Sequence, residues 1–213
     1  MRARLVTAIE RFRFRDSRTF WEHNYAAGGN SGPGSYGEMA DFKARVLNDF
    51  VTANGVQSVI EFGCGDGNQL SLARYPTYVG LDISPSAIRL CIDQFAEDST
   101  KSFFAYDWQA WHDPLRVIRA DLALSLDVLF HVVEDDAYDA YLRHLFAAAN
   151  LHVIIYSIND DRPFPEPYSK PRRFTDWVET HQPTWRLDGV IPNEYPVGDG
   201  GGSWSDFYVF GRA

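Results

Sequence analysis

The sequence predicts an α/β fold in which a doubly wound, mostly parallel sheet of seven strands carries helices on both faces and ends in an antiparallel hairpin. Between residues 56 and 157, short apolar or β-branched runs alternate with amphipathic stretches. That alternation is typical of repeated β-loop-α units, which build a parallel sheet. Farther along, residues 184–190 and 205–210 are strand-like, and a segment rich in breakers, residues 192–202, separates them without a helix. Such a pair predicts the closing hairpin.

The first 55 residues are expected to form helices and a glycine-rich lid. Leu5, Ile9 and Phe12 have the spacing of a helix's packing face. Residues 28–37 hold five glycines and a proline and must form a loop. Residues 38–53 then place apolar side chains at helical intervals and predict an amphipathic helix.

The central elements follow in order. The β-branched residues 58–62 predict a buried strand that runs directly into a glycine-rich loop, and residues 68–74 are expected to form the next helix. A second strand, residues 78–82, ends on an acid; Ser84 is placed to cap the following helix, with Pro85 in its first turn. Further strands are expected at residues 102–105, 122–126 and 152–157, and a helix at residues 135–149.

Composition limits the class of protein. With 213 residues, 45% of them hydrophobic, the chain fits one domain over residues 1–213, in which an N-terminal segment (residues 1–55) precedes the core (residues 56–213). A net charge of -9 opposes binding to nucleic acid. Two cysteines give no disulfide framework, and no apolar run approaches the roughly 20 residues of a membrane span. We therefore expect a soluble, cytoplasmic protein.

The loop after the first strand, Glu61-Phe62-Gly63-Cys64-Gly65-Asp66-Gly67, is the most informative motif. Glycines at a strand end let a ligand approach the backbone closely. The spacing G-x-G-x-G differs from the G-x-G-x-x-G of dinucleotide sites. Glu61 would repel a pyrophosphate but suits an ammonium group, so a nicotinamide-dependent oxidoreductase is the weaker alternative.

This loop resembles motif I of the class I (Rossmann-like) methyltransferases that use S-adenosylmethionine (SAM), of the type acting on small molecules or glycans. Asp82 lies about 20 positions after Glu61, where the family binds the ribose hydroxyls. The resemblance also implies that Asp107 accepts from the adenine amino group and that Trp108 contacts the ring. The cofactor-binding residues that it implies are Glu61, Gly63, Cys64, Gly65, Gly67, Asp82, Ile83, Asp107, Trp108, Ser125 and Asp127.

His131 is the candidate catalytic base, because it follows the fourth strand at the carboxyl edge of the sheet, where open α/β sheets bind ligands. The alternative is a histidine that only packs or caps there. The histidines lack metal-ligand spacing, and the acidic run at residues 134–136 is interpreted as the charged first turn of a helix, so no metal is expected.

The methyl acceptor is the least defined feature. Residues 28–37 and 163–173 are where substrate contacts are expected. Lys170, Arg172 and Arg173 form a basic cluster that favours an anionic acceptor, or else a solvated surface loop. Tyr25, Tyr36 and Tyr168 are candidates to stack on a sugar or aromatic ring. We expect methyl transfer to oxygen of a small molecule or glycan; an N-methyltransferase and a non-catalytic SAM-binding protein remain alternatives, and the oligomeric state stays open.

Overall fold

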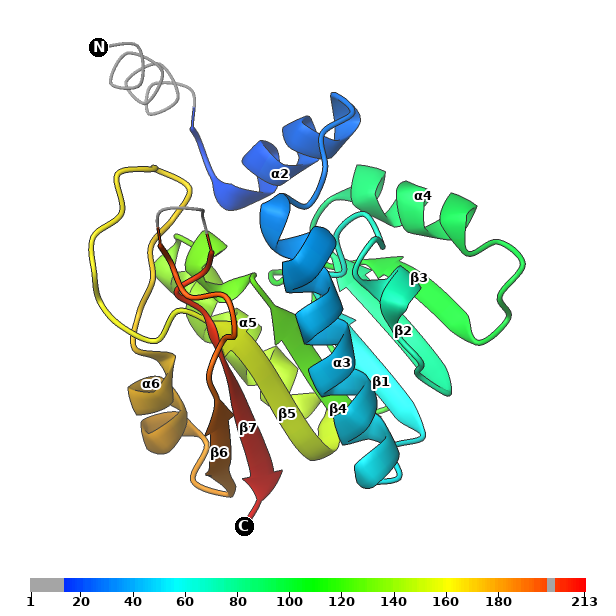
Figure 1. Ribbon diagram of the computed structural model, residues 1–213, viewed down its shortest axis with the longest axis vertical. Coiled ribbons are helices and arrows are strands. Elements are labelled where there is room, and N and C mark those ends of the chain that lie inside the picture. The colour runs from blue at the N-terminus through cyan, green and yellow to red at the C-terminus, as the bar shows by residue number, and fades with distance from the viewer. Residues whose placement is uncertain (1–13, 199–201) are drawn as a thin grey trace.

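The computed structural model describes residues 14–198 and 202–213 (Figure 1), so the predicted helix face of Leu5, Ile9 and Phe12 lies outside the described residues. Seven strands form one sheet in the order β3-β2-β1-β4-β5-β7-β6. Their bounds are β1 Ser58–Phe62, β2 Thr77–Asp82, β3 Lys101–Ala105, β4 Ala120–Leu126, β5 Ala149–Ser157, β6 Trp185–Ile191 and β7 Asp206–Arg212.

Strands β1 to β5 are parallel, and β7 pairs antiparallel with both β5 and β6. The predicted seven-stranded sheet with a closing antiparallel pair is therefore confirmed. The order of the strands reverses between β1 and β4. Open α/β sheets bind their ligands at such a point, beyond the carboxyl ends of the strands.

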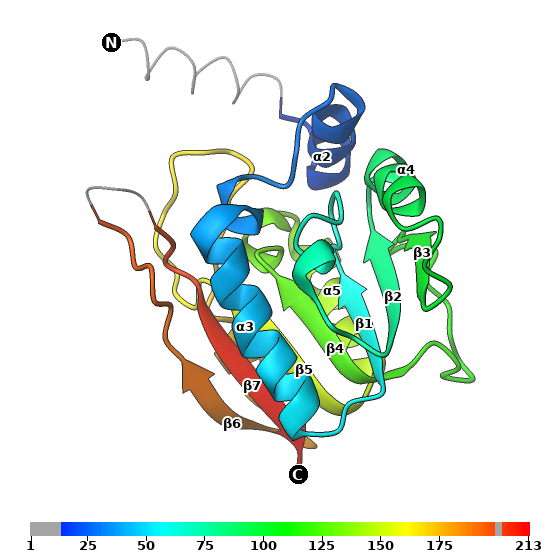
Figure 2. The ribbon, with the colours of Figure 1, turned by 45° about the vertical axis from the view of Figure 1, so that its right-hand side comes forward.

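Helices cover both faces of the sheet (Figure 2). Their bounds are α2 Ser17–Ala26, α3 Gly37–Ala53, α4 Pro85–Gln94, α5 Asp135–Ala147 and α6 Phe174–His181, with short 3₁₀ turns η1 Pro33–Ser35, η2 Leu70–Leu72 and η3 Leu129–His131. Ser84 caps α4 by accepting from the Ala87 amide, and Pro85 begins the helix, as predicted. Helix α2 lies across the carboxyl ends of the strands (Figures 1 and 2).

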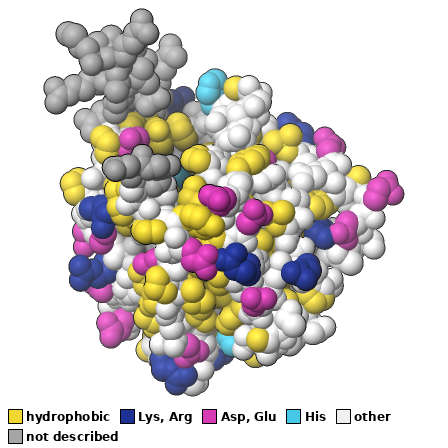
Figure 3. Space-filling model, viewed as in Figure 1, with side chains coloured by type: hydrophobic (Ala, Val, Ile, Leu, Met, Phe, Trp, Pro, Cys, Tyr) yellow, Lys and Arg dark blue, Asp and Glu magenta, His cyan; other side chains and the backbone are white. Residues whose placement is uncertain are grey.

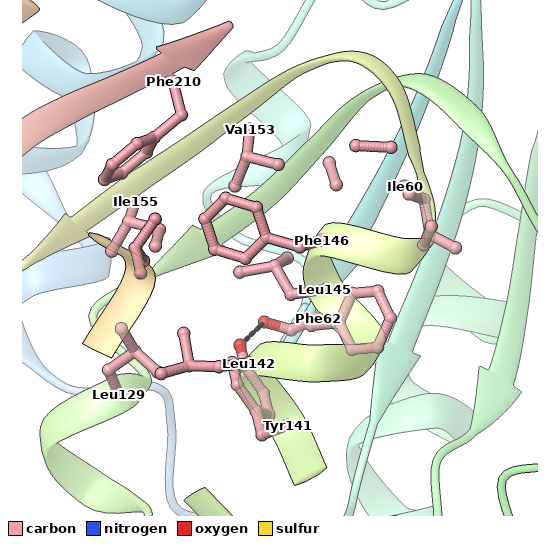
Figure 4. Packing of buried hydrophobic residues seen from close by; sticks show 14 of the residues in the cluster. Ile60, Phe62, Leu129, Tyr141, Leu142, Leu145, Phe146, Val153, Ile155 and Phe210 are labelled. Carbon is pink, nitrogen blue, oxygen red and sulfur yellow. Dashed lines mark hydrogen bonds between the residues drawn. The ribbon is translucent and has the colours of Figure 1, made fainter. Parts of the chain in front are cut away.

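Alternate residues of each strand supply two apolar layers. On one face, α3 and α4 pack on side chains such as Tyr78 and Leu124. On the other, α5 and α6 pack on the sheet, and the ring of Phe146 lies near Val153, Ile155 and Phe210 in Figure 4. These layers hold the carboxyl edge of the sheet in place.

The helix predicted at residues 68–74 is wrong, because only the single turn η2 forms there. Asn48 of α3 explains the difference. Its side chain accepts from the Arg74 amide at 2.7 Å and donates to the Leu72 carbonyl at 3.0 Å, so these groups are satisfied without a helix. Pro76 also disfavours helical geometry at the preceding residue.

Acidic and basic side chains are interspersed on the face of the molecule in Figure 3. Within the described residues of the chain, no helix has the length and apolar character needed to cross a membrane.

Candidate active site

A cavity of about 810 Å³ lies at the carboxyl ends of β1, β2 and β4. Its walls come from the glycine loop, from residues 82–83 and 126–131, from Tyr168, and from residues 17–37, which we call the cover. Cavities of this size hold drug-sized ligands. The cavity therefore lies where the strand order reverses, at the carboxyl edge of the sheet.

The glycine loop needs its glycines. Gly63, Gly65 and Gly67 have φ values of 85°, 58° and 81°, which side chains rarely adopt. A Cβ atom at Gly63 would also collide with Val128, and one at Gly65 with Ser31 of the cover. The loop is thus packed closely between Val128, just after β4, and the cover, and it presents backbone to the cavity.

Asp82 ends β2 and lines the cavity although it is only 6% exposed. Its Oδ2 accepts from the Gly65 amide at 2.9 Å and its Oδ1 from the Ser84 amide at 2.8 Å. Burial raises the pKa of Asp82 to about 6, against the effect of these two hydrogen bonds. A carboxylate has about four lone pairs, so each oxygen retains capacity to accept from a ligand hydroxyl. Ile83, the next residue, also lines the cavity.

Glu61, on β1, lies at the cavity wall and accepts from the Tyr78 hydroxyl at 2.6 Å. Burial raises the pKa of Glu61 to about 7, while Tyr78 and the positive charge of Lys43 act in the opposite direction. The group is consequently poised between its neutral and ionised forms at neutral pH, and a bound cation would favour the ionised form.

Lys43, a residue that the sequence reasoning missed, supplies a buried positive charge to the cavity wall. Its Nζ lies 2.7 Å from Oδ2 of Asp127 and 5.2 Å from the centre of the Tyr156 ring. The signal was available: Met39, Lys43 and Leu47 follow each other at intervals of four, so the lysine occupies the buried stripe of α3.

Asp127 has a φ of 57°, which is uncommon for a residue with a side chain. Lys43 holds one carboxylate oxygen, and the Ser205 hydroxyl donates to the other at 3.1 Å. The backbone of Asp127 also donates to the Tyr156 carbonyl at 2.8 Å. These contacts fix the turn that leads from β4 into η3.

His131 ends η3 and lines the same cavity. Its Nδ1 lies 2.9 Å from the carbonyl oxygen of Tyr168. Since a carbonyl can only accept, Nδ1 carries the hydrogen and Nε2 keeps its lone pair. Burial lowers the pKa of His131 below its ordinary value, opposed by the Tyr168 hydrogen bond and the charge of Asp127. His131 is accordingly neutral at neutral pH.

An aromatic wall surrounds His131. The rings of Phe20 and Tyr168 stack with centroids 4.4 Å apart, and Trp21 meets His131 edge-on at 4.9 Å. Phe130 and Tyr25 also line the cavity. Phe20, Trp21 and Phe130 were not among the predicted site residues. For Phe20 and Trp21 there was a signal, because they precede the glycine-rich segment 28–37 as part of an aromatic cluster.

Besides the Arg18–Asp107 ion pair, hydrogen bonds fasten the cover to Glu134, to the start of α4 and to the glycine loop. Ser17 donates through its amide and hydroxyl to Glu134, each at 2.8 Å. Glu22 accepts from the Ser84 and Ser86 hydroxyls at the start of α4. At the glycine loop, Asp66 accepts from the Ser31 amide and the Tyr36 hydroxyl, both at 2.8 Å.

Other predicted site residues lie outside the described walls of the cavity. Asp107 pairs with Arg18 at 2.9 Å, although its neighbour Trp108 lines the cavity. Ser125 is buried, with its hydroxyl 2.7 Å from that of Tyr141. The residues that do not appear in the walls are Gly67, Asp107, Ser125, Tyr36, Lys170, Arg172 and Arg173.

The basic cluster is already engaged in ion pairs. Lys170 and Arg172 both contact Asp135, at 2.6 and 2.7 Å, and Arg173 lies 4.0 Å from Asp176. As for metals, residues 14–198 and 202–213 contain no group of three or more His, Cys, Asp or Glu side chains arranged to hold an ion.

Comparison with known proteins agrees with this architecture. Residues 35–187 match a family model described as a methyltransferase domain. No curated protein matches the sequence. The match spans more than half of the chain, and the chain belongs to this methyltransferase domain family.

Solved structures share the fold at low sequence identity. The N-methyltransferase NodS from Bradyrhizobium japonicum WM9 superposes with a TM-score of 0.67 at 14% identity, over 93% of this chain and 99% of that one. Magnesium protoporphyrin IX methyltransferase from Synechocystis PCC 6803 gives 0.64 at 16%, over 94% and 99%. The methyltransferase domain of bacterial CtHen1 gives 0.64 at 19%, over 81% and 98%. These structures show the shared fold, and the family match over residues 35–187 confirms the predicted methyltransferase class.

Proposed function

We propose that this enzyme transfers the methyl group of S-adenosyl-L-methionine to an oxygen atom of a small-molecule or sugar acceptor. The observation that carries the oxygen assignment is the state of His131: Nδ1 is bound to the Tyr168 carbonyl, so Nε2 is free to take a proton. A hydroxyl nucleophile needs such a base, because its proton must leave as the carbon–oxygen bond forms.

The residues of the cavity fit the cofactor. Asp82 offers both carboxylate oxygens to the ribose hydroxyls, and the positive-φ backbone of the glycine loop allows close approach. Glu61 suits the ammonium group and Lys43 the carboxylate of the methionine moiety, because their charges are buried at one wall. Trp108, which lines the cavity, is assigned to the adenine ring, and Asp107 to its amino group, which requires Asp107 to leave its pair with Arg18. When bound, the cofactor supplies an electrophilic methyl group on a sulfonium.

The protein's own contribution is to orient the acceptor and move one proton. The aromatic wall would position a ring of the acceptor next to His131 and would exclude water from the imidazole. His131 accepts the acceptor's proton at Nε2, and the hydrogen bond from Nδ1 to Tyr168 together with Asp127 stabilises the resulting imidazolium. We propose that residues 1–213 form one domain that carries out the reaction. We also propose that the protein is cytoplasmic.

A nitrogen acceptor is the second candidate. Asp16 and Glu134 line the end of the cavity near the aromatic wall and would attract an amine. The basic cluster of Lys170, Arg172 and Arg173 predicts an anionic acceptor instead, and that requires Lys170 and Arg172 to leave Asp135.

A methyl-release assay tests the proposal. Purified enzyme and SAM are incubated with matched panels of neutral sugars, phenols, amines, and phosphorylated or carboxylated metabolites, and S-adenosylhomocysteine (SAH) formation is measured. We expect turnover with a hydroxyl acceptor and its loss in His131→Ala. Turnover restricted to amines would replace oxygen by nitrogen, and SAM binding without turnover on any panel would overturn the proposed transfer.

A further inference from the structure

The loop before α6 is joined to the segment that carries His131. The Lys170 amide donates to the Phe130 carbonyl at 2.7 Å, and the Tyr168 carbonyl accepts from Nδ1 of His131. The same loop continues into Arg172, whose side chain is 17% exposed. The geometry of His131 therefore depends on where residues 168–172 are held.

Arg172 holds this loop against residues 132–135. Its guanidinium donates to the carbonyl oxygens of Val132 and Val133 at 2.8 and 2.9 Å and contacts Asp135 at 2.7 Å. It also lies over the ring of Tyr138, 4.1 Å from the centroid. One planar group thus ties together two consecutive carbonyls, a carboxylate and a ring, which suits the fixed fork of arginine.

We propose that Arg172 is a positioning residue for His131: by binding the Val132 and Val133 carbonyls, it keeps the Tyr168 carbonyl against Nδ1 and so keeps Nε2 as the proton-accepting nitrogen. This inference rests on the proposed function, in which His131 is the base. It gives Arg172 a role other than the expected contact with an anionic acceptor.

Without the guanidinium, two carbonyls at the turn after His131 lose their donor. Buried or half-buried carbonyls left unpaired seek other partners, so the backbone of residues 132–133 and the loop 168–172 would separate. The hydrogen on the neutral imidazole would then no longer be restricted to Nδ1, because the bond to Tyr168 is what selects that tautomer.

The test is ¹⁵N NMR of the histidine rings in the SAH-bound full chain, with His131 assigned from the spectrum of His131→Gln. In the unmodified protein we expect the Nδ1-protonated tautomer. Arg172→Met keeps the apolar packing on Tyr138, and Arg172→Lys keeps the charge but cannot span two carbonyls. Both should shift His131 toward a mixture of tautomers and lower kcat about tenfold or more, with little change in the KM for SAM.

Two variants separate this role from others. Asp135→Asn removes the ion pair but leaves the carbonyl bonds, so the tautomer should persist. Arg186→Met removes a surface arginine paired with Asp188 far from the cavity and controls for loss of charge. If Arg172→Met does not fold, Arg172→Lys decides the question.

An unchanged tautomer in Arg172→Lys, or a defect confined to the KM of an anionic acceptor and rescued by lysine, would overturn the inference. The NMR result does not require turnover. A protein that shows the expected tautomer shift but methylates none of the acceptor panels would leave the positioning intact and refute the proposed function.

Discussion

Asp82 and Glu61 hold their carboxyl groups out of water, and this makes cofactor binding depend on pH. Their pKa values, about 6 and about 7, are raised by burial, so both groups ionise only as the pH rises through that range. Ribose hydroxyls and an ammonium group bind the ionised forms. We expect SAM affinity to increase about tenfold or more between pH 5 and pH 8, measured by titration calorimetry.

Glu61→Gln serves as the control for this pH dependence, and it should remove the component of the change centred near pH 7. Affinity that is flat with pH in the unmodified protein would contradict the assignment. The folding stability of the free protein depends on pH in the opposite direction and falls as the pH rises. A raised carboxyl pKa contributes stability below the unfolded value of about 4, and this is lost as the pH rises through the folded value.

His131 is the residue on which the proposed chemistry depends. Replacement by alanine should lower kcat by roughly 10² or more, because proton transfer is lost, while the Kd for SAM stays within about twofold. Steady-state kinetics with the acceptor found by the panels, together with calorimetry, measures both quantities. A parallel loss of turnover and SAM affinity would show that His131 only packs at the strand end.

For single residues, a linear motif was sufficient to predict groups that the structure places in the cavity wall, such as Gly63, Gly65 and Asp82. The sequence was insufficient for Lys43, because its charge reaches Asp127 only when α3 packs on the sheet. Arg172 shows the same limit: its charge pattern predicted a solvated loop or an anion site, whereas backbone carbonyls from another segment hold it.

Among the elements, the cover includes a regular helix, α2, but few of its residues are buried. Tyr25 is buried, but much of residues 26–38 is exposed and joined by single hydrogen bonds to Asp66. Segments of this kind open at low free energy. Hydrogen exchange of residues 17–37 should slow on SAM binding, while the amides of α6 remain unchanged.

Ser31→Ala removes two contacts of the cover, with the Tyr25 hydroxyl and the Asp66 amide, and should raise exchange of the cover in the free protein. Equal exchange with and without SAM would count against the predicted lid.

Residues 68–74 show how a distant contact can decide the structure of an element. A helix was expected there because residues 68–74 follow the first strand and its glycine loop. The side chain of Asn48, 20 or more positions away, binds the backbone instead.

For the whole molecule, the pattern of apolar runs was enough to predict the sheet. Alternate residues of these runs fill the two layers of the core, and the final hairpin has no helix within it. The pattern of apolar runs did not predict which helices pack over the carboxyl edge of the sheet. That arrangement depends on contacts such as Ser17 with Glu134, between residues more than 100 positions apart.

The layer between α5 and the sheet should dominate stability. Phe146 is 1% exposed and contacts the rings of Trp185 and Phe210, so Phe146→Ala is expected to lower the free energy of unfolding by about 3–5 kcal/mol. Denaturant titration measures the change. Leu151→Ala, at a half-exposed position of β5, is the matched control and should cost under about 1 kcal/mol. Equal losses would mean that α5 contributes little to the core.

The contacts that hold the cover also predict which step of the reaction is slowest. We predict that spent cofactor leaves after contacts such as those at Glu134, Ser84 and Asp66 separate, and that this step is slower than methyl transfer itself. Rapid-quench measurements should therefore show a burst of methylated product, close to one equivalent per enzyme, before the slower steady rate. Linear product formation from the first turnover would place the slow step in the chemistry instead.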